Sequence, residues 1–313
     1  MLKHFSVLKD ELLEGLQWQG GVLIDCTLGF GGHTLAFLES SPLTQVYAFD
    51  RDNSAITLAK ERLQPYASRI HFHHCAFSAA LEHLDKRILK QSRGIIADLG
   101  VSSMQLDDKL RGFNFSSKNL DMRMDTRAEF SAQKVLNSYP PTRLEEIFRI
   151  YGEFKQSKKL THIIVESRER KPFESCAELS ALIEGHFPRT GGIHPATLAF
   201  QALRIEVNDE LNELRTLLSS IEQAYRAKIL KNCKIGIIAF HSLEDRIIKQ
   251  YFKQWSKSCI CPQENYKCEC GNNNALGEIL TKKPITPKSQ EISQNKRSRS
   301  AKLRIFALGT GNE

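Results

Sequence analysis

The sequence lacks any long apolar run. No stretch approaches the roughly 18 apolar residues that a membrane-spanning helix needs, and the opening segment, MLKHFSVLKDELLEGL, shows no signal-peptide pattern. Internal repeats and long low-complexity tracts are also missing. These absences argue against membrane, exported and repeat proteins, and we expect a globular protein in the cytoplasm, with no membrane partner.

The sequence also lacks the C-x-x-C pairs that are typical of structural zinc sites. Four of the eight cysteines stand singly in apolar segments, as small buried residues in a reducing compartment do: Cys26, Cys75, Cys176 and Cys233. The other four form a C-x-C…C-x-C pattern: Cys259, Cys261, Cys268 and Cys270. Four thiolates could bind zinc, but structural zinc sites more often use C-x-x-C spacing. We interpret this pattern as a loop of reduced thiols and predict no metal site.

The charge balance is basic. Lys and Arg number 44 against 36 Asp and Glu, which gives a net charge of +8 and a sequence pI near 9.0. This favours an anionic partner, although a mildly basic cytosolic enzyme fits equally well. A basic run at 296–302 precedes the last apolar segment. It indicates either a solvated sheet edge or a strip that contacts phosphates.

Apolar strand-like segments alternate with helical ones. Five segments predict parallel strands: 22–25, 45–50, 69–73, 94–98 and 234–240. Helical segments lie between them, for example at 55–63 and 78–84. This alternation is typical of a doubly wound α/β fold, in which helices cover both faces of a parallel sheet. The last apolar segment, 302–308, alternates polar and apolar residues and predicts an edge strand.

The connection between the fourth and fifth predicted strands, 99–233, is far longer than a crossover requires. Its pattern is helical, with a capping box that starts at Ser175 and a long periodic run that starts at Pro195. We predict an inserted helical domain at 107–194. We assign the long helix to the main domain, which then comprises 1–106 and 195–313.

A glycine-rich loop, DCTLGFGGHT at 25–34, joins the first strand to a helix. Its glycines remove side chains where a backbone must approach a ligand, and the strand, turn and helix start suit a nucleotide-like ligand. A nicotinamide dinucleotide would require a third glycine where Thr34 stands. Asp25 instead gives D-x-x-x-G-x-G-G, which resembles the first motif of methyltransferases that use S-adenosylmethionine. Asp50 ends the second strand and could bind a ribose; alternatively, Asp50 or Asp52 only caps the next helix.

A set of longer motifs runs nearly the length of the chain. They are HFSVL (4–8), AFDRD (48–52), FSA (77–79), IIADLGVSSMQLDDKLRGFNF (95–115), LDMRMD (120–125), HPATLAFQALRIEVNDEL (194–211), FHSLEDR (240–246) and RSRSAKLR (297–304). This series resembles the MraW or RsmH family, bacterial methyltransferases that modify N4 of a cytidine in the decoding centre of 16S ribosomal RNA. The family usually has proline where Ser6 and Asn53 stand, and Gly-Pro at 118–119.

The resemblance implies a Rossmann-like S-adenosylmethionine methyltransferase sheet, with a helical substrate-recognition domain inserted between the fourth and fifth strands. It implies S-adenosylmethionine as cofactor and 16S ribosomal RNA in the small ribosomal subunit as partner. It also implies a set of cofactor-binding residues: Gly31, Gly32, His33, Asp50, Phe77, Asp98 and Gln105. For His33 the alternative is a residue that only caps the start of the helix.

Methyl transfer to the cytosine amine makes its own demands. The lone pair of this nitrogen is delocalised into the ring, so the site must align the reacting atoms and accept a hydrogen bond from the amine. The prolines and aromatic residue of the D/N/S-P-P-Y/F motif of related amino-methyltransferases are absent after the fourth strand. We predict Asp98 and Ser102 as catalytic residues, with a backbone carbonyl as the remaining candidate acceptor.

A flipped target base needs an apolar surface to receive it. Phe113 and Phe115 are candidates for stacking and Arg111 for a phosphate contact; the alternative is burial at the entry to the inserted domain. The segment 241–245 follows the fifth strand and could line the substrate site. Its alternative is a capping box formed by Ser242 and Asp245.

Two other functions remain open at this point. One is a non-catalytic RNA-binding factor of methyltransferase fold that takes part in ribosome assembly. The intact loop, Asp50 and Asp98 argue against it. The other is a nicotinamide-dependent oxidoreductase, which Thr34 and the family pattern disfavour.

Overall fold

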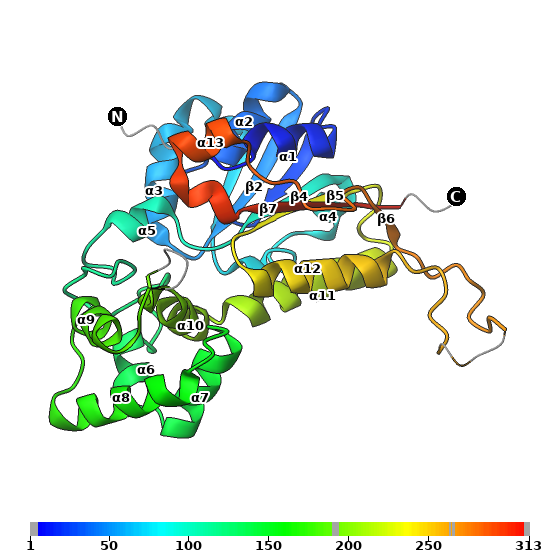
Figure 1. Ribbon diagram of the computed structural model, residues 1–313. Helices are drawn as coiled ribbons and strands as arrows, with labels where there is room; N and C mark the ends of the chain where they lie inside the picture. The colour runs from blue at the N-terminus through cyan, green and yellow to red at the C-terminus, as the bar shows by residue number, and fades with distance from the viewer. Residues whose placement is uncertain (1–5, 190–193, 263, 265–266, 310–313) are drawn as a thin grey trace. The chain divides into compact units, whose positions relative to one another are not determined.

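The chain forms two compact units, one made of residues 1–100 with 212–313 and the other of residues 101–211. The computed structural model describes residues 6–189, 194–262, 264 and 267–309 (Figure 1). Within these residues, every helix is too short or too polar to cross a membrane.

The first unit is built on a seven-stranded sheet in the order β3-β2-β1-β4-β5-β7-β6 (Figure 1). Neighbouring strands from β3 to β5 are parallel, and β7 is antiparallel to both of its neighbours. The strands are β1 Gly21–Asp25, β2 Thr44–Asp50, β3 Ile70–His74, β4 Ser92–Asp98, β5 Lys234–Ala239, β6 Gly277–Ile279 and β7 Lys302–Leu308. All five predicted parallel strands are confirmed, with ends within two residues of those expected.

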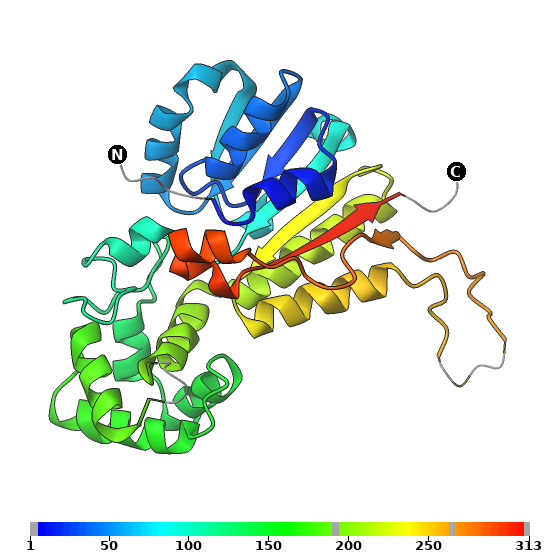
Figure 2. The same cartoon turned by 45° about the horizontal axis from the view of Figure 1, so that its top comes forward.

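The prediction of an edge strand at the end of the chain is wrong. β7 lies between β5 and β6 and runs opposite to β5, as the red and yellow arrows of Figure 2 show. β6, which has three residues, covers its outer side. The polar residue that suggested an exposed face, Arg304, is buried, and its Nε donates to Oδ1 of Asp245 at 2.6 Å. Because this arginine is paired, it can occupy an interior strand.

Helices cover both faces of this sheet. α1 and α2 pack on one face, and α11 and α12 pack on the other (Figure 1). The helices of the first unit are α1 Lys9–Leu16, α2 Gly32–Ser40, α3 Asn53–Arg62, α4 Lys86–Gln91, α11 Glu210–Arg226, α12 Ser242–Trp255 and α13 Ser289–Gln294, with 3-10 turns η1 Gln64–Arg69, η2 Phe77–Ala79 and η3 Lys296–Ser300. The segment 78–84 was expected to be helical. It contains only the end of η2 followed by turns, and α4 begins further on, capped by Asp85.

The second unit is helical and has its own apolar core. Its helices are α5 Ser103–Asp107, α6 Ala132–Ser138, α7 Pro141–Ile150, α8 Ser157–Arg170, α9 Cys176–His186 and α10 Ala196–Asn208. Phe148, Leu160 and Leu179, from three of these helices, are fully buried in that core. The capping box at Ser175 is confirmed: its side chain accepts from the Glu178 amide, and Glu178 accepts from the Ser175 amide.

The long helix expected from Pro195 onward is two helices. Asp209, with φ of 52°, breaks the run between α10 and α11. α10 belongs to the helical unit because Phe200 and Leu203 are part of its core. Asn208 fixes the end of α10, since its side chain accepts from the Met124 amide at 2.7 Å and donates to the Met122 carbonyl at 2.7 Å. The helical unit therefore extends beyond the expected limits of 107–194.

Candidate active site

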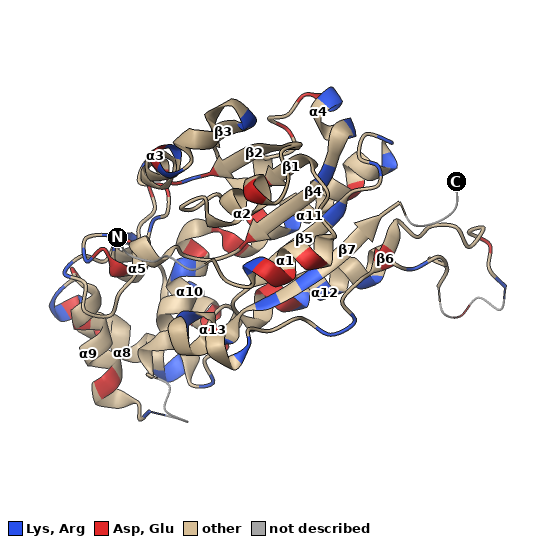
Figure 3. Cartoon of the chain, turned by 90° about the horizontal axis from the view of Figure 1, so that it is seen from above, with Lys and Arg blue, Asp and Glu red and all other residues tan. Residues whose placement is uncertain are grey.

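Three carboxylates stand at the ends of adjacent strands. Asp25 ends β1, Asp50 ends β2 and Asp98 ends β4, and β1 pairs in parallel with both of the others. β1 and β2 are tan for most of their length in Figure 3, because their other side chains are uncharged. The carboxyl ends of parallel strands form the edge at which open α/β sheets bind ligands.

Asp25 secures the start of the glycine loop. It is 1% exposed. Its Oδ1 accepts from the Thr27 amide at 3.1 Å, and its Oδ2 accepts from the Thr34 hydroxyl at 2.6 Å. Burial raises the pKa of Asp25 above its usual value. Because Thr34 lies on α2, this carboxylate ties the loop to the start of that helix.

Asp50 secures the middle of the same loop. Its Oδ2 accepts from the Gly29 amide at 2.8 Å, and its Oδ1 accepts from the Asp52 amide at 2.8 Å. Burial raises the pKa of Asp50 to about 6. The residue that caps α3 is Asp52, which accepts from the Ser54 amide at 3.0 Å. Asp52 therefore caps the helix, and Asp50 binds the loop. Each oxygen of Asp50 accepts one hydrogen bond from a backbone amide and can accept another from a ligand.

The glycines of the loop serve different purposes. Gly29 has a φ of 50°, and a side chain there would meet no atom within 4 Å. Gly31 has a φ of 70°, and a Cβ would lie 2.5 Å from Cδ1 of Leu63. A Cβ on Gly32 would collide with the hydroxyl of Ser6. Open space for a ligand therefore adjoins Gly29, whereas the side chains of Leu63 and Ser6 lie close to Gly31 and Gly32, and the positive φ of Gly31 itself favours glycine.

His33 faces Asp98. It is not a helix cap, since the residue before α2 is Gly31 and no side chain caps that helix. The imidazole is buried, with Nε2 3.4 Å from Oδ2 of Asp98. Burial by itself lowers the pKa of His33, but contact with Asp98 and the charge of Asp25 raise this pKa above its ordinary value overall.

Asp98 offers an unused acceptor. Its amide donates to the Thr27 hydroxyl at 2.6 Å, which joins the end of β4 to the glycine loop. Its Oδ1 is buried and, like Nδ1 of His33, has no hydrogen-bond partner in the part of the chain that the structure describes. Buried polar atoms normally have a hydrogen-bond partner. Two such atoms without a partner, Oδ1 of Asp98 and Nδ1 of His33, therefore fit a polar ligand at this edge of the sheet.

Phe77 lies on η2 and is half-buried. The next amide, of Ser78, donates to Oε2 of Glu213 at 3.4 Å, and Oε1 of Glu213 lies 3.3 Å from Nη2 of Arg51. Glu213 thus links η2 to the residue after Asp50. Sequence reasoning missed Glu213, together with Thr27 and Thr34, because no motif marks residues that act by joining separate strand ends.

Ser102 and Gln105 lie in the helical unit and form a capping box at the start of α5. The Ser102 amide donates to Oε1 of Gln105 at 3.0 Å, and the Gln105 amide donates to Oγ of Ser102 at 3.3 Å. Both side chains therefore already have a backbone partner. Their predicted roles in catalysis and cofactor binding remain predictions.

The residues expected to receive a base are mostly structural. Phe113 is buried in the core of the helical unit, which leaves no open face for stacking. Phe115 already stacks on His194, with ring centroids 4.6 Å apart. Nη2 of Arg111 donates to the carbonyls of Arg123 at 3.1 Å and Met124 at 2.9 Å. For Phe113 the alternative of burial is correct.

The cap that follows β5 is shifted by one residue from its expected place. His241, not Ser242, is the cap of α12, and Glu244 completes the box by accepting from the His241 amide at 3.3 Å. Asp245 instead pairs with β7, where it binds Arg304 and lies 3.4 Å from Nζ of Lys302.

An open, mostly parallel sheet with a glycine-rich first loop binds its ligand beyond the carboxyl ends of its strands. In the strand order observed here, with β7 reversed, this is the sheet of the S-adenosylmethionine-dependent methyltransferases. The chain belongs to the MraW methylase family, whose model matches residues 1–308.

Curated relatives agree with this assignment. The chain is 64% identical to a "Ribosomal RNA small subunit methyltransferase H" of Helicobacter hepaticus, across 100% of this chain and 99% of the relative. It is 49% identical to the protein of the same name from Helicobacter pylori, across 97% and 96%. A solved "rRNA Methylase" from Streptococcus thermophilus is 11% identical across 98% and 99%, with a TM-score of 0.42. A likeness this low supports no conclusion about function.

The contact between His33 and Asp98 predicts a titration that can be followed directly. In the native protein, nuclear magnetic resonance should give a pKa for His33 above the usual 6.5 or so. Asp98→Asn should lower this pKa, because the partner charge is lost. The stabilisation from the pair should be complete below about pH 6.5 and should disappear as the pH rises through the pKa of folded His33.

Glu166→Gln provides the control. It removes a carboxylate 3.6 Å from the exposed imidazole of His162, in the other unit, and should leave the titration of His33 unchanged. A His33 pKa that is the same in the native protein and in Asp98→Asn would show that the pair is not coupled.

Proposed function

We propose that this protein transfers a methyl group from S-adenosylmethionine to N4 of a cytidine in 16S ribosomal RNA, within the small ribosomal subunit in the cytoplasm. The observation that carries the proposal is the unpaired carboxylate oxygen of Asp98, buried beside the glycine loop in a chain of the MraW methylase family. Relatives named for methylation of small-subunit ribosomal RNA support the choice of substrate.

The residues at the strand ends fit the cofactor. When bound, S-adenosylmethionine supplies a methyl group on a positively charged sulfur. The open space beside Gly29 admits the ligand close to the backbone, and Asp50 can accept from ribose hydroxyls. Phe77 offers an apolar face to adenine. Asp98 and His33 present unpaired polar atoms to the ligand's polar groups. Gly31, Gly32 and Gln105 join this set by family resemblance.

Asp98 also suits the methyl transfer itself. As the bond between N4 and the methyl carbon forms, the bond from that carbon to sulfur breaks and N4 must lose a proton. Oδ1 of Asp98 can accept a hydrogen bond from the amine, which localises the nitrogen lone pair. His33, 3.4 Å from the other oxygen, orients the carboxylate and offsets its charge when protonated. Ser102 is the alternative acceptor.

The basic run lies at the same edge of the sheet. β7 is antiparallel to β5, so its first residue, Lys302, pairs with Ala239 at the carboxyl end of β5. η3 immediately precedes β7, and its Lys296, Arg297 and Arg299 are exposed. These cations therefore flank the carboxyl ends of the strands, where they can contact the phosphates of an RNA substrate.

The decisive experiment uses small ribosomal subunits from cells that lack this methylation. The subunits are incubated with the protein and with S-adenosylmethionine labelled on its methyl group, and the RNA is digested to nucleosides. We expect the label in N4-methylcytidine at one position in the decoding region. Tight binding of subunits and cofactor without any transfer of label would instead identify a non-catalytic assembly factor.

The role of Asp50 predicts a loss of cofactor affinity. Asp50→Ala should weaken S-adenosylmethionine binding by about 1.5 to 3 kcal/mol, the range for hydrogen bonds to a charged group. Affinity in the native protein should also rise between pH 5 and pH 7, as the Asp50 carboxyl loses its proton near pH 6. Calorimetry at several pH values measures both effects.

Asp52→Asn is the matched control, because asparagine still caps α3 and only the charge is removed. This variant should bind S-adenosylmethionine with the affinity of the native protein. Unchanged affinity in a folded Asp50→Ala variant would remove Asp50 from the cofactor site.

The role of Asp98 predicts a loss in the chemical step. Asp98→Asn should lower the single-turnover methylation rate by about 10²-fold or more at saturating cofactor, the scale of lost proton-transfer assistance. If Asp98 only holds the cofactor, saturation should restore the rate. Ser102→Ala tests the alternative acceptor and leaves Asp98 intact. Near-normal rates in both variants would place the acceptor elsewhere.

The basic run predicts a change in the salt dependence of RNA binding. Replacing Arg297 and Arg299 with glutamine should weaken binding and reduce the slope of log K against log salt by about 1.5 units. Lys302 is left in place because it already pairs with Asp245.

Lys86→Gln with Lys90→Gln is the control for this experiment. It removes the same charge from α4, which leads into the amino end of β4, at the opposite edge of the sheet. Equal slopes for the two double variants would show that η3 is no more than a solvated surface.

A further inference from the structure

The segment between α12 and β6, residues 256–276, has no apolar core of its own. Among the residues described there, none from Ser256 to Ala275 is buried and none lies in a helix or strand. Ile260 is 59% exposed. Two backbone hydrogen bonds close its base: the Leu276 amide donates to the Trp255 carbonyl at 2.7 Å, and the Asn274 amide donates to the Ser258 carbonyl at 3.0 Å. Burial of apolar surface therefore cannot hold the rest of the segment in place.

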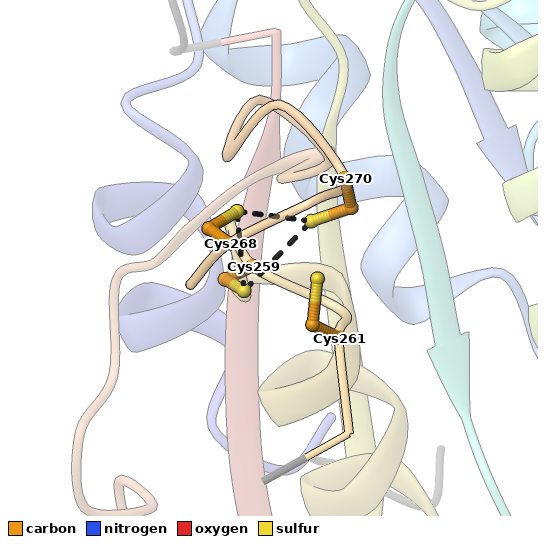
Figure 4. Close-up of side chains that lie close together, drawn as sticks. All are labelled: Cys259, Cys261, Cys268 and Cys270. Carbon is orange, nitrogen blue, oxygen red and sulfur yellow. Dashed lines mark hydrogen bonds between the residues drawn. The ribbon is translucent and has the colours of Figure 1, made fainter. Parts of the chain in front are cut away.

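Four cysteine sulfurs nevertheless meet in this segment (Figure 4). All four lie within 4.8 Å of one another: Cys259, Cys261, Cys268 and Cys270. The Sγ–Sγ separations are 3.6 Å from Cys259 to Cys268, 3.5 Å from Cys268 to Cys270 and 3.8 Å from Cys270 to Cys259. These are far longer than the roughly 2.05 Å of a disulfide bond.

These three separations match those around one tetrahedral metal ion, and the upper limit of 4.8 Å for all four sulfurs allows Cys261 to complete the set. Sulfurs at about 2.3 Å from zinc form a tetrahedron with edges of about 3.8 Å. A cluster of four irons would place each sulfur on a different iron, and a cluster of two irons would place two sulfurs on each, so either cluster would hold some of the four sulfurs further apart. The size of the site therefore fits a single ion.

Backbone amides of each arm point at a sulfur of the other arm. The Ile260 amide donates to Sγ of Cys270 at 3.4 Å, and the Glu269 amide donates to Sγ of Cys261 at 3.3 Å. Hydrogen bonds of this kind stabilise thiolates, and they orient metal ligands from outside the coordination shell. The two C-x-C arms are thus arranged symmetrically around the sulfurs.

We propose that Cys259, Cys261, Cys268 and Cys270 bind one zinc ion. Four protein thiolates fill a tetrahedral shell and leave no position for water or substrate, so the site is structural. The metal takes the place of an apolar core and fixes the segment between α12 and β6. The unusual C-x-C spacing, which favoured free thiols when only the sequence was considered, is accommodated because the two arms approach face to face.

The first test is the metal content of the full-length protein, purified under reducing conditions without chelator. Elemental mass spectrometry should find about one zinc per chain. Exchange with Co²⁺ should give the intense thiolate-to-metal absorption of a tetrahedral thiolate site. Removal of zinc by a strong chelator should expose four additional reactive thiols and make the segment 256–276 susceptible to protease.

Variants locate the site. Cys261→Ser with Cys268→Ser removes one ligand from each arm and should abolish stoichiometric zinc. Cys75→Ser, a change at a half-buried cysteine outside the segment, should keep one zinc per chain. The zinc content of the native protein tests the proposal even if the double variant does not fold.

Three results would overturn the proposal. One is folded native protein with less than about a tenth of an equivalent of zinc. The second is a stoichiometric amount of iron with visible absorption. The third is a thiol count that shows two disulfide bonds in the segment.

Discussion

The need to pair buried carboxylates organises the carboxyl edge of the sheet. Asp25 and Asp50 lose hydration when the sheet forms, and an unpaired charge in that place would be costly. The amides of Thr27 and Gly29 supply the missing donors, so the two acids fix the path of the glycine loop. The Thr27 hydroxyl then receives the Asp98 amide. Through this chain of hydrogen bonds, strands β1, β2 and β4 define one site.

Much of the sheet could be predicted because its strands obey a simple rule. A parallel strand covered on both faces is a nearly continuous apolar run, and β1 and β5 follow this pattern closely, whereas the edge strand β3 alternates apolar residues with histidines. The rule fails for β7, where Arg304 looks like a residue of an exposed face until Asp245, 59 positions away, neutralises it. Helix periodicity in turn does not reveal the break at Asp209, since α10 and α11 share one periodic pattern and the positive φ of Asp209 separates them.

The site was predictable where a residue acts alone, but not where residues act together. Asp50 and Asp98 end strands, and that position can be read from the sequence. The contact between His33 and Asp98 depends on how β4 pairs with β1, and no local pattern in the sequence shows that the four cysteine sulfurs lie within 4.8 Å of one another. The glycines show the same limit: the sequence does not reveal that open space adjoins Gly29, or that the side chains of Leu63 and Ser6 lie beside Gly31 and Gly32.

The insertion of the helical unit between β4 and β5 has a consequence for how the chain folds during its synthesis. β4 is hydrogen-bonded on its second side only by β5, and residues 99–233 must leave the ribosome before β5 does. At ordinary elongation rates this delay is on the order of ten seconds. The helical unit has its own core, and helical domains are among the fastest to fold, so it can fold within that interval. The nascent protein therefore carries an open strand edge for a defined time, during which chaperones can bind it.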